Sequence, residues 1–95
     1  MPGPNIGFDW DEANVGHLAR HKVTPEEAEH VILNDPVDLG TELADGEERY
    51  LNLGSTQQGR VLVVVTTWRD ERVRVVTAFS AIRRLVRFYY QERGK

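Results

Sequence analysis

The chain has no cysteine among its 95 residues, which excludes a disulfide framework and any thiolate site. Long apolar segments are also missing, because the longest apolar run, residues 61–65, is only strand-sized. The first residues lack the basic start and the apolar stretch of a signal peptide. These absences predict a cytoplasmic protein that does not associate with membranes.

Basic residues are scarce in the first part of the chain. Residues 1–59 carry three basic and twelve acidic side chains, whereas residues 60–95 carry nine basic and three acidic ones. Eight of the nine late basic residues are arginines, whose planar guanidinium group can donate two hydrogen bonds to one phosphate. The net charge of −3 therefore hides a division that favours a polyanion or an acidic protein as partner.

Two helices are predicted before any strand. Asp9 or Asp11 is a suitable N-cap for a helix that ends near residue 20. The second helix begins more clearly, because Thr24-Pro25-Glu26-Glu27 combines a capping box with proline at the first helical position. Asn34-Asp35-Pro36 ends this helix.

Strands and a last helix follow. The strand signals cover residues 37–43, 48–53, 60–67 and 72–79. Ser80 is a suitable cap for the last helix, whose apolar face carries Ile82, Leu85, Val86 and Tyr89. The length fits one domain over residues 1–95. We therefore predict an α+β fold with two N-terminal helices, a three- to four-stranded antiparallel sheet and a C-terminal helix, and with the helices packed on one sheet face.

The last predicted hairpin assigns its side chains to two faces. A loop of two or four residues places Arg72 and Arg74 on the face of the odd-numbered residues 61–67. The even-numbered residues then share the expected core face with Val73, Val75 and Phe79. The arginine face would be a partly apolar sheet surface, covered by a partner or by a second copy of the chain.

More arginines follow in the last predicted helix. Arg83, Arg84 and Arg87 lie off its apolar face and would border the arginine face of the sheet. With Tyr89 or Tyr90 they would form a site for single-stranded nucleic acid, with guanidinium groups on phosphate and an aromatic ring on a base. A solvated helix face with salt bridges to the acidic first part explains the same pattern.

Six short motifs stand in order along the chain. They read FDWDEAN (8–14), LARHKVTPEEA (18–28), DGEERY (45–50), LG (53–54), GRVLVVV (59–65) and RVRVVTA (72–78). Their order and spacing resemble the BrnT family of bacterial toxins over about residues 8–90. The resemblance implies a RelE-like fold and an endoribonuclease that stops growth by cutting RNA. It also implies that no metal or organic cofactor is needed, and that a small BrnA-like antitoxin neutralises the toxin.

Four positions depart from the family pattern. Phe79 stands where the family usually has arginine, and Leu85 and Val86 stand where it usually has glutamate and arginine. Lys22 replaces the customary glycine after His21. Three alternatives follow: Arg83, Arg84 or Arg87 of the last helix supplies the missing charge, the activity is weak, or the chain is a catalytically degenerate module that contacts antitoxin or RNA without cleavage.

RNA cleavage by this class uses the 2′-hydroxyl as nucleophile, and it needs a base, an acid and cations around the phosphate. His21 is the best candidate for proton transfer, because imidazole changes its charge near neutral pH. It would equally serve as a C-cap at the negative end of the first helix. Arg72 and Arg74 are candidates for stabilising the transition state, or for cross-strand pairing with glutamates such as Glu48.

Lys22 and Arg60 are candidate phosphate contacts, although each also suits a solvated turn. His17 and His21 are four residues apart and would share one face of the first helix. A metal site needs at least a third ligand, and His30 belongs to another predicted helix. A metal-dependent enzyme is therefore the least favoured of the three hypotheses.

Overall fold

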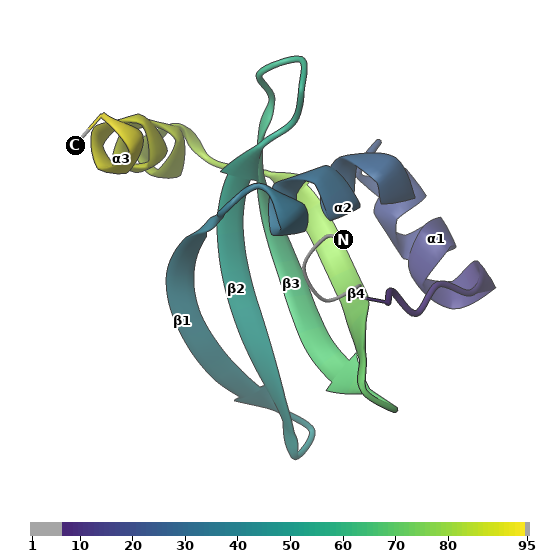
Figure 1. The fold of residues 1–95 in the computed structure, drawn as a ribbon. Coiled ribbons are helices and arrows are strands. Elements are labelled where there is room, and N and C mark those ends of the chain that lie inside the picture. Colours follow the sequence, from purple (N-terminus) through teal and green to yellow (C-terminus); the bar gives the residue numbers. More distant parts are fainter. Residues whose placement is uncertain (1–6, 95) are drawn as a thin grey trace.

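The structure, a computed structural model, describes residues 7–94. Its four strands form one antiparallel sheet in the order β1-β2-β3-β4 (Figure 1). The elements are α1 (Glu12–Arg20), α2 (Pro25–Leu33), β1 (Val37–Ala44), β2 (Glu47–Ser55), β3 (Val61–Arg69), β4 (Arg72–Ser80) and α3 (Arg83–Arg93). The predicted α+β class and element order are confirmed.

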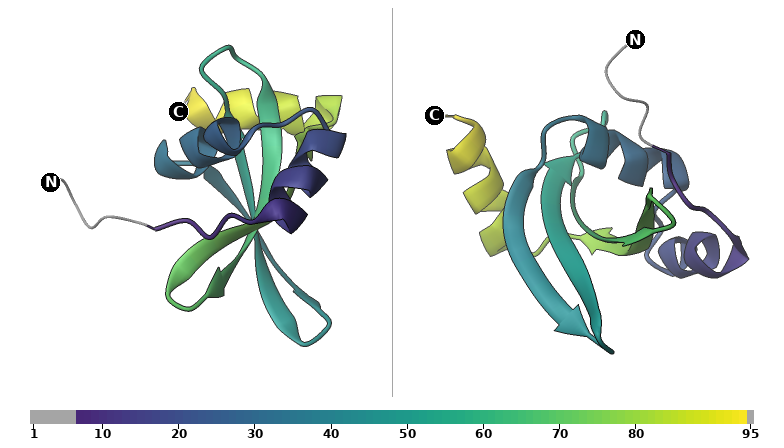
Figure 2. Two further views of the ribbon diagram at one scale, coloured as in Figure 1. Left: turned by 90° about the vertical axis from the view of Figure 1, so that its right-hand side faces the viewer. Right: turned by 60° about the horizontal axis from the view of Figure 1, so that its bottom comes forward.

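Helices cover both faces of the sheet (Figure 2). On one face, Leu62 and Val64 of β3 form a core with residues of α1 and α2, among them Leu18 and Val31. On the other face, Val61, Val63 and Val65 of β3 pack in a second core with Tyr89 of α3. The prediction that all helices share one face is therefore wrong, because β3 is apolar on both sides and needs two covers. The chain itself also covers part of the face that was expected to await a partner or a second copy.

The β3–β4 hairpin follows the expected faces only near its turn. Asp70 and Glu71 form a two-residue loop with φ of 52° and 64°, as hairpins of this length require. Thr67 pairs with Arg74, but a bulge then inserts one extra residue, Val76, into β4. Beyond the bulge, Phe79 pairs with Val63, so its predicted place on the face of Leu62 and Val64 is wrong.

The starts of the helices differ in how well the sequence predicts them. In α2, Thr24 Oγ1 accepts from the Glu27 N–H at 3.1 Å, and Glu27 Oε1 accepts from the Thr24 N–H at 3.0 Å. Asp11 is the N-cap of α1, as expected. The predicted cap of the last helix is wrong, because the N-cap of α3 is Ile82, without a side-chain hydrogen bond, while Ser80 ends β4.

Gly54 of β2 lets α2 approach the sheet closely. A Cβ atom at this position would lie 2.7 Å from Val31 Cγ1, and both residues are buried. We expect Gly54→Ala to lower the free energy of unfolding by about 1–3 kcal/mol in urea denaturation. Gly16→Ala is the matched control, since nothing lies within 4 Å of its Cβ position and alanine favours the helix. Equal stability of the two variants would contradict this packing.

Candidate nucleic-acid interface

Arg74, a predicted catalytic residue, is 9% exposed and bound to two aspartates. Its Nη1 lies 3.0 Å from Asp11 Oδ2 and 3.3 Å from Asp9 Oδ2, and its Nη2 lies 3.1 Å from Asp11 Oδ1. Next to this ion pair, the Asp9 N–H donates to the Val73 carbonyl at 2.9 Å. Arg74 therefore fastens the N-terminal segment to the edge of β4, and two carboxylates already neutralise its charge. The alternative pairing with Glu48 does not occur.

The same ion pair lowers the pKa of Asp11, and this makes the stability of the folded chain depend on pH in acid. The hydrogen bond from Arg74 is the main reason that the pKa of Asp11 lies below its ordinary value of 3.8, and the Asn14 N–H adds to the effect. A lowered carboxyl pKa stabilises the folded state fully above the ordinary value, and this contribution is lost as the pH falls through the lowered pKa.

We therefore expect the unfolding free energy of the wild type to fall below about pH 4 more steeply than that of Asp11→Asn. Asparagine keeps an oxygen for the N-cap, so the comparison isolates the charge. Asp45→Asn, in an exposed turn, provides the matched control and should keep the wild-type slope. The measurement is urea unfolding over a series of acidic pH values, and equal slopes for all three proteins would contradict the role of the ion pair.

The three predicted catalytic residues do not form one site. The ring of His21 lies 6.0 Å from the ring of Phe79, near the C-terminal end of β4. Arg72 and Arg74 lie at the hairpin end of the same strand. The five-residue step from Arg74 to Phe79 spans about 16 Å at about 3.3 Å per residue. The structure thus separates Arg72 and Arg74 from His21.

Arg60, a predicted phosphate contact, holds the end of α1. Its Nη1 donates to the Lys22 carbonyl at 2.6 Å and its Nη2 to the His21 carbonyl at 2.9 Å. Its Nε donates to Ser80 Oγ at 3.0 Å, which ties β4 to the same point. Lys22, with φ of 59°, makes the turn after α1, and its side chain is exposed. Arg60 thus fixes the backbone that carries His21, while Lys22 stays accessible to a ligand.

The structural role of His21 uses its backbone and leaves its side chain unengaged by hydrogen bonds within residues 7–94. Its backbone N–H donates to the Leu18 carbonyl at 2.9 Å, which confirms the predicted C-cap of α1. Its imidazole is exposed, lies 6.2 Å from the His17 ring, and makes no hydrogen bond within residues 7–94. The ring is therefore accessible to a ligand.

The N-terminal part of α3 gathers unpaired positive charge. Arg83, Arg84 and Arg87 line a hollow of about 380 Å³ together with Ile82. None of the three arginines has a carboxylate partner in the described part of the chain. Because α3 has no side-chain cap, its first N–H groups add to the positive potential. The arrangement suits an anion such as a phosphate.

Tyr89, which was predicted to stack on RNA, is buried in the structure. The residue is 8% exposed and belongs to the core with Val61 and Val63. Its ring meets the ring of Tyr90 at 5.2 Å between centroids. Tyr90 is 54% exposed and lies seven residues after Arg83 and three after Arg87, on the same helix stripe. Tyr90 is thus the aromatic ring that a base could reach.

The divided charge of the sequence has a partly structural explanation. Three late arginines pair with acids of the first part, whereas Arg83, Arg84 and Arg87, for which salt bridges were the alternative, form none among the described residues. The pairs are Arg60 with Glu27 at 4.0 Å, Arg74 with Asp9 and Asp11, and Arg93 with Asp35 at 3.4 Å. Among the described residues, the late arginines outside any ion pair are Arg69 and Arg72 at the hairpin and the three of the α3 hollow.

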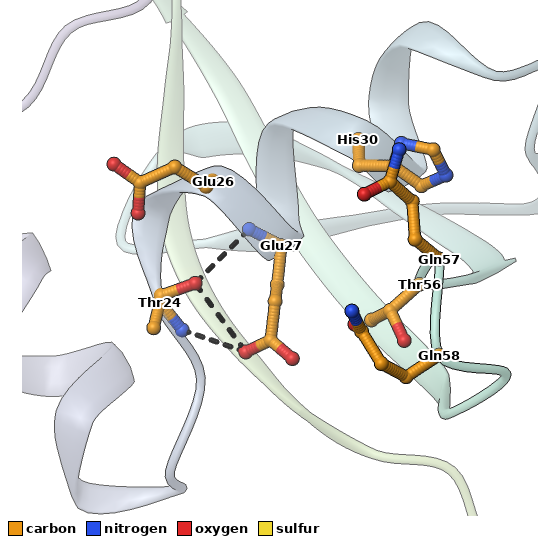
Figure 3. Close-up of a pocket in the computed structure, with 7 residues that line it drawn as sticks. All are labelled: Thr24, Glu26, Glu27, His30, Thr56, Gln57 and Gln58. Carbon is orange, nitrogen blue, oxygen red and sulfur yellow. Dashed lines mark hydrogen bonds between the residues drawn. The ribbon is translucent and has the colours of Figure 1, made fainter.

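A second hollow, of about 370 Å³, lies between α2 and the β2–β3 loop (Figure 3). Its lining residues are Thr24, Glu26, Glu27, His30, Thr56, Gln57 and Gln58. The motifs of the sequence did not indicate this hollow, because its two glutamines stand in a polar loop with no distinguishing pattern. It adjoins the end of α1, since Glu27 Oε1 lies 4.0 Å from Arg60 Nη1.

Residues 7–94 contain no group of three or more histidines or acids placed to hold a metal ion, so His17 and His21 have no third ligand there. No helix in this range is long and apolar enough to cross a membrane.

One family model matches residues 10–84, and its description reads "Ribonuclease toxin, BrnT, of type II toxin-antitoxin system". No curated protein matches the chain.

Proposed function

Since the chain belongs to the family of BrnT ribonuclease toxins of type II toxin–antitoxin systems, we propose that it is a metal-independent endoribonuclease that binds RNA around the C-terminal end of β4. The observation that carries this proposal is the imidazole of His21, which is exposed and makes no hydrogen bond within residues 7–94. Arg60 binds the backbone carbonyl of His21 and the hydroxyl of Ser80, and so holds this residue at the end of β4. The N-cap of α3, Ile82, follows two residues later and opens the arginine hollow. A strand of RNA that crosses this end would meet a proton acceptor and then cations.

His21 would act as the base in cleavage. Its imidazole takes the proton of the 2′-hydroxyl, whose oxygen then forms a bond to the adjacent phosphorus. The bond from phosphorus to the 5′-oxygen breaks, and the leaving oxygen takes up a proton from solvent water. The products are a 2′,3′-cyclic phosphate and a 5′-hydroxyl end. Lys22 and the three arginines of the α3 hollow would stabilise the negative charge that develops on the phosphate.

The neighbour of His21 supports a second candidate function. Phe79, with its ring 6.0 Å from the His21 ring, stands where the family usually has arginine. This side chain of β4, which lies beside the His21 ring, therefore brings no positive charge to a phosphate there. A non-catalytic module that holds RNA or the antitoxin would result if the α3 arginines do not replace that charge.

A type II toxin implies an antitoxin protein as partner. We propose that this partner is BrnA-like and that it neutralises the chain by binding it. Inducing the chain alone in bacteria should arrest growth and fragment RNA, and co-expression of the neighbouring gene product should restore both. Normal growth with intact RNA at good expression would contradict the enzymatic proposal, and a stable complex without cleavage would favour the binding module.

The two sets of unpaired arginines allow a matched test of where RNA binds. We expect Arg83→Ala with Arg84→Ala to weaken the binding of single-stranded RNA about tenfold, because two phosphate contacts are lost. Arg69→Ala with Arg72→Ala removes the same charge at the opposite end of β4 and should change affinity less than about twofold. Fluorescence anisotropy with 2′-O-methyl RNA, which has no free 2′-hydroxyl, measures binding alone. Equal losses in both variants would contradict the proposed surface.

A further inference from the structure

The hollow between α2 and the β2–β3 loop holds polar side chains that the fold does not use. Within residues 7–94, the side chains of Glu26, Gln57 and Gln58 make no hydrogen bond, and all three are exposed. Glu27 uses its Oε1 for Thr24 and leaves its Oε2 unbonded. Figure 3 shows Glu26 and Glu27 on one side of the space and Gln57 and Gln58 on the other, with His30 of α2 beside Gln57. The hollow thus offers carboxylate acceptors together with amide donors and acceptors.

The chemistry of this hollow excludes a phosphate. Two carboxylates, those of Glu26 and Glu27, line it and would repel an anion. The N–H of Glu27, near the start of α2, is already bound to Thr24 Oγ1 at 3.1 Å. A neutral planar group with N–H donors fits better, and a volume of about 370 Å³ lies at the small end of the range for ligand sites. The base of a nucleotide has these properties.

The hollow lies next to the proposed cleavage site. Arg60 is the connection, since its Nη1 lies 4.0 Å from Glu27 Oε1 while its Nη2 binds the His21 carbonyl at 2.9 Å. Thr56 of the loop is tied to the same residue, because its Oγ1 accepts from the Arg60 N–H at 3.1 Å. A nucleotide adjoining a phosphate at His21 would therefore have the hollow within its reach.

We infer that this hollow binds one base of the RNA strand and selects bases that carry an exocyclic amino group over uracil. The inference rests on the proposed function, in which RNA lies beside His21. Carboxylates accept hydrogen bonds from the amino groups of adenine, cytosine and guanine. Uracil has a carbonyl oxygen at C4 instead, and this acceptor cannot form a hydrogen bond with a carboxylate. The ring of His30, which is partly buried in the wall of the hollow, offers a surface for base stacking.

Cytosine and uracil provide the sharpest comparison, because they are alike in size and differ at the amino position. The test uses the full chain and two probes, 2′-O-methyl hexacytidylate and 2′-O-methyl hexauridylate. Binding of each probe is monitored through the amide chemical shifts of the chain in NMR titrations. The wild type should bind the cytidine probe about fivefold more tightly. During titration with the cytidine probe, the amide chemical shifts of the hollow should change most at residues 26–30 and 56–58. The triple variant Glu26→Gln, Gln57→Ala, Gln58→Ala should lose the preference, while Glu42→Gln, an exposed charge change on the edge strand β1, should keep it.

Each remaining result overturns the inference in a distinguishable way. Equal affinity for the two probes, or shifts confined to α3 and the end of α1, would overturn base selection in the hollow and leave RNA binding intact. A triple variant that keeps the full preference would place the selection elsewhere. If neither probe moved any amide of the chain, the proposed function would fail together with the inference.

Discussion

The His21→Ala variant is expected to cleave RNA about 10² to 10⁴ times more slowly than the wild type, which is the usual contribution of a base that transfers protons. The expectation rests on the free imidazole, which is exposed and makes no hydrogen bond within residues 7–94. The structural role of His21 uses only its backbone, through the N–H to Leu18 and the carbonyl to Arg60. Alanine keeps these bonds, so the variant should fold with nearly unchanged stability.

The measurement is single-turnover cleavage of a short labelled RNA by purified protein. His17→Ala is the matched control, because this exposed imidazole lies one turn before His21, with 6.2 Å between the ring centroids. It should keep its rate within about threefold, since it takes no proton in the proposed mechanism. An unchanged rate in His21→Ala, or an equal loss in both variants, would exclude His21 as the base.

The second large effect concerns stability, and we expect Asn14→Ala to lower the unfolding free energy by about 2–4 kcal/mol. Asn14 is 3% exposed and joins three parts of the fold. Its Oδ1 accepts from the Asp11 N–H at 2.8 Å, and its Nδ2 donates to the Asp9 carbonyl at 2.8 Å and to the Val75 carbonyl at 3.1 Å. Its removal leaves the backbone groups of a buried junction without partners.

Urea unfolding of Asn14→Ala should be compared with that of Asn34→Ala. Asn34 also bonds a carbonyl, that of His30 at 2.7 Å, but it does so at an exposed helix end and should contribute less than about 1 kcal/mol. Asn14→Asp refines the test, because it keeps the acceptor for Asp11 but loses the donor to Val75. It should be at least as destabilising as the alanine variant, and full stability of either Asn14 variant would contradict the role of this junction.

Features encoded by neighbouring residues could be predicted from the sequence. The capping box at Thr24 and the two-residue turn between β3 and β4 depend on residues within a few positions of each other. The pair Asp11 and Asn14 has the same cap spacing and could have indicated the junction, although its link to Val75 spans 61 residues. The periodicity of the last helix already placed Tyr89 on the apolar face, and its burial follows that pattern rather than the RNA role assigned to it.

Features that depend on distant partners could not be predicted. The bulge at Val76 reverses the face of Phe79 without a glycine or any other local signal. Arg74 finds its aspartates 63 and 65 positions away, and Ser80 is engaged by Arg60 instead of capping α3. The sequence therefore predicted that the arginines of residues 60–95 form one surface. In the structure, three of them make ion pairs that hold the fold together, and the unpaired arginines divide between the two ends of β4.

The most direct test of the central claim is the chemistry of the RNA ends. Purified chain is incubated with a defined single-stranded RNA in the presence of a metal chelator, and the products are analysed by mass spectrometry. The proposed mechanism predicts fragments with 2′,3′-cyclic phosphate and 5′-hydroxyl ends, which largely disappear when His21→Ala replaces the wild type. Intact RNA at stoichiometric protein, or cleavage that stops on chelation, would contradict a metal-independent ribonuclease.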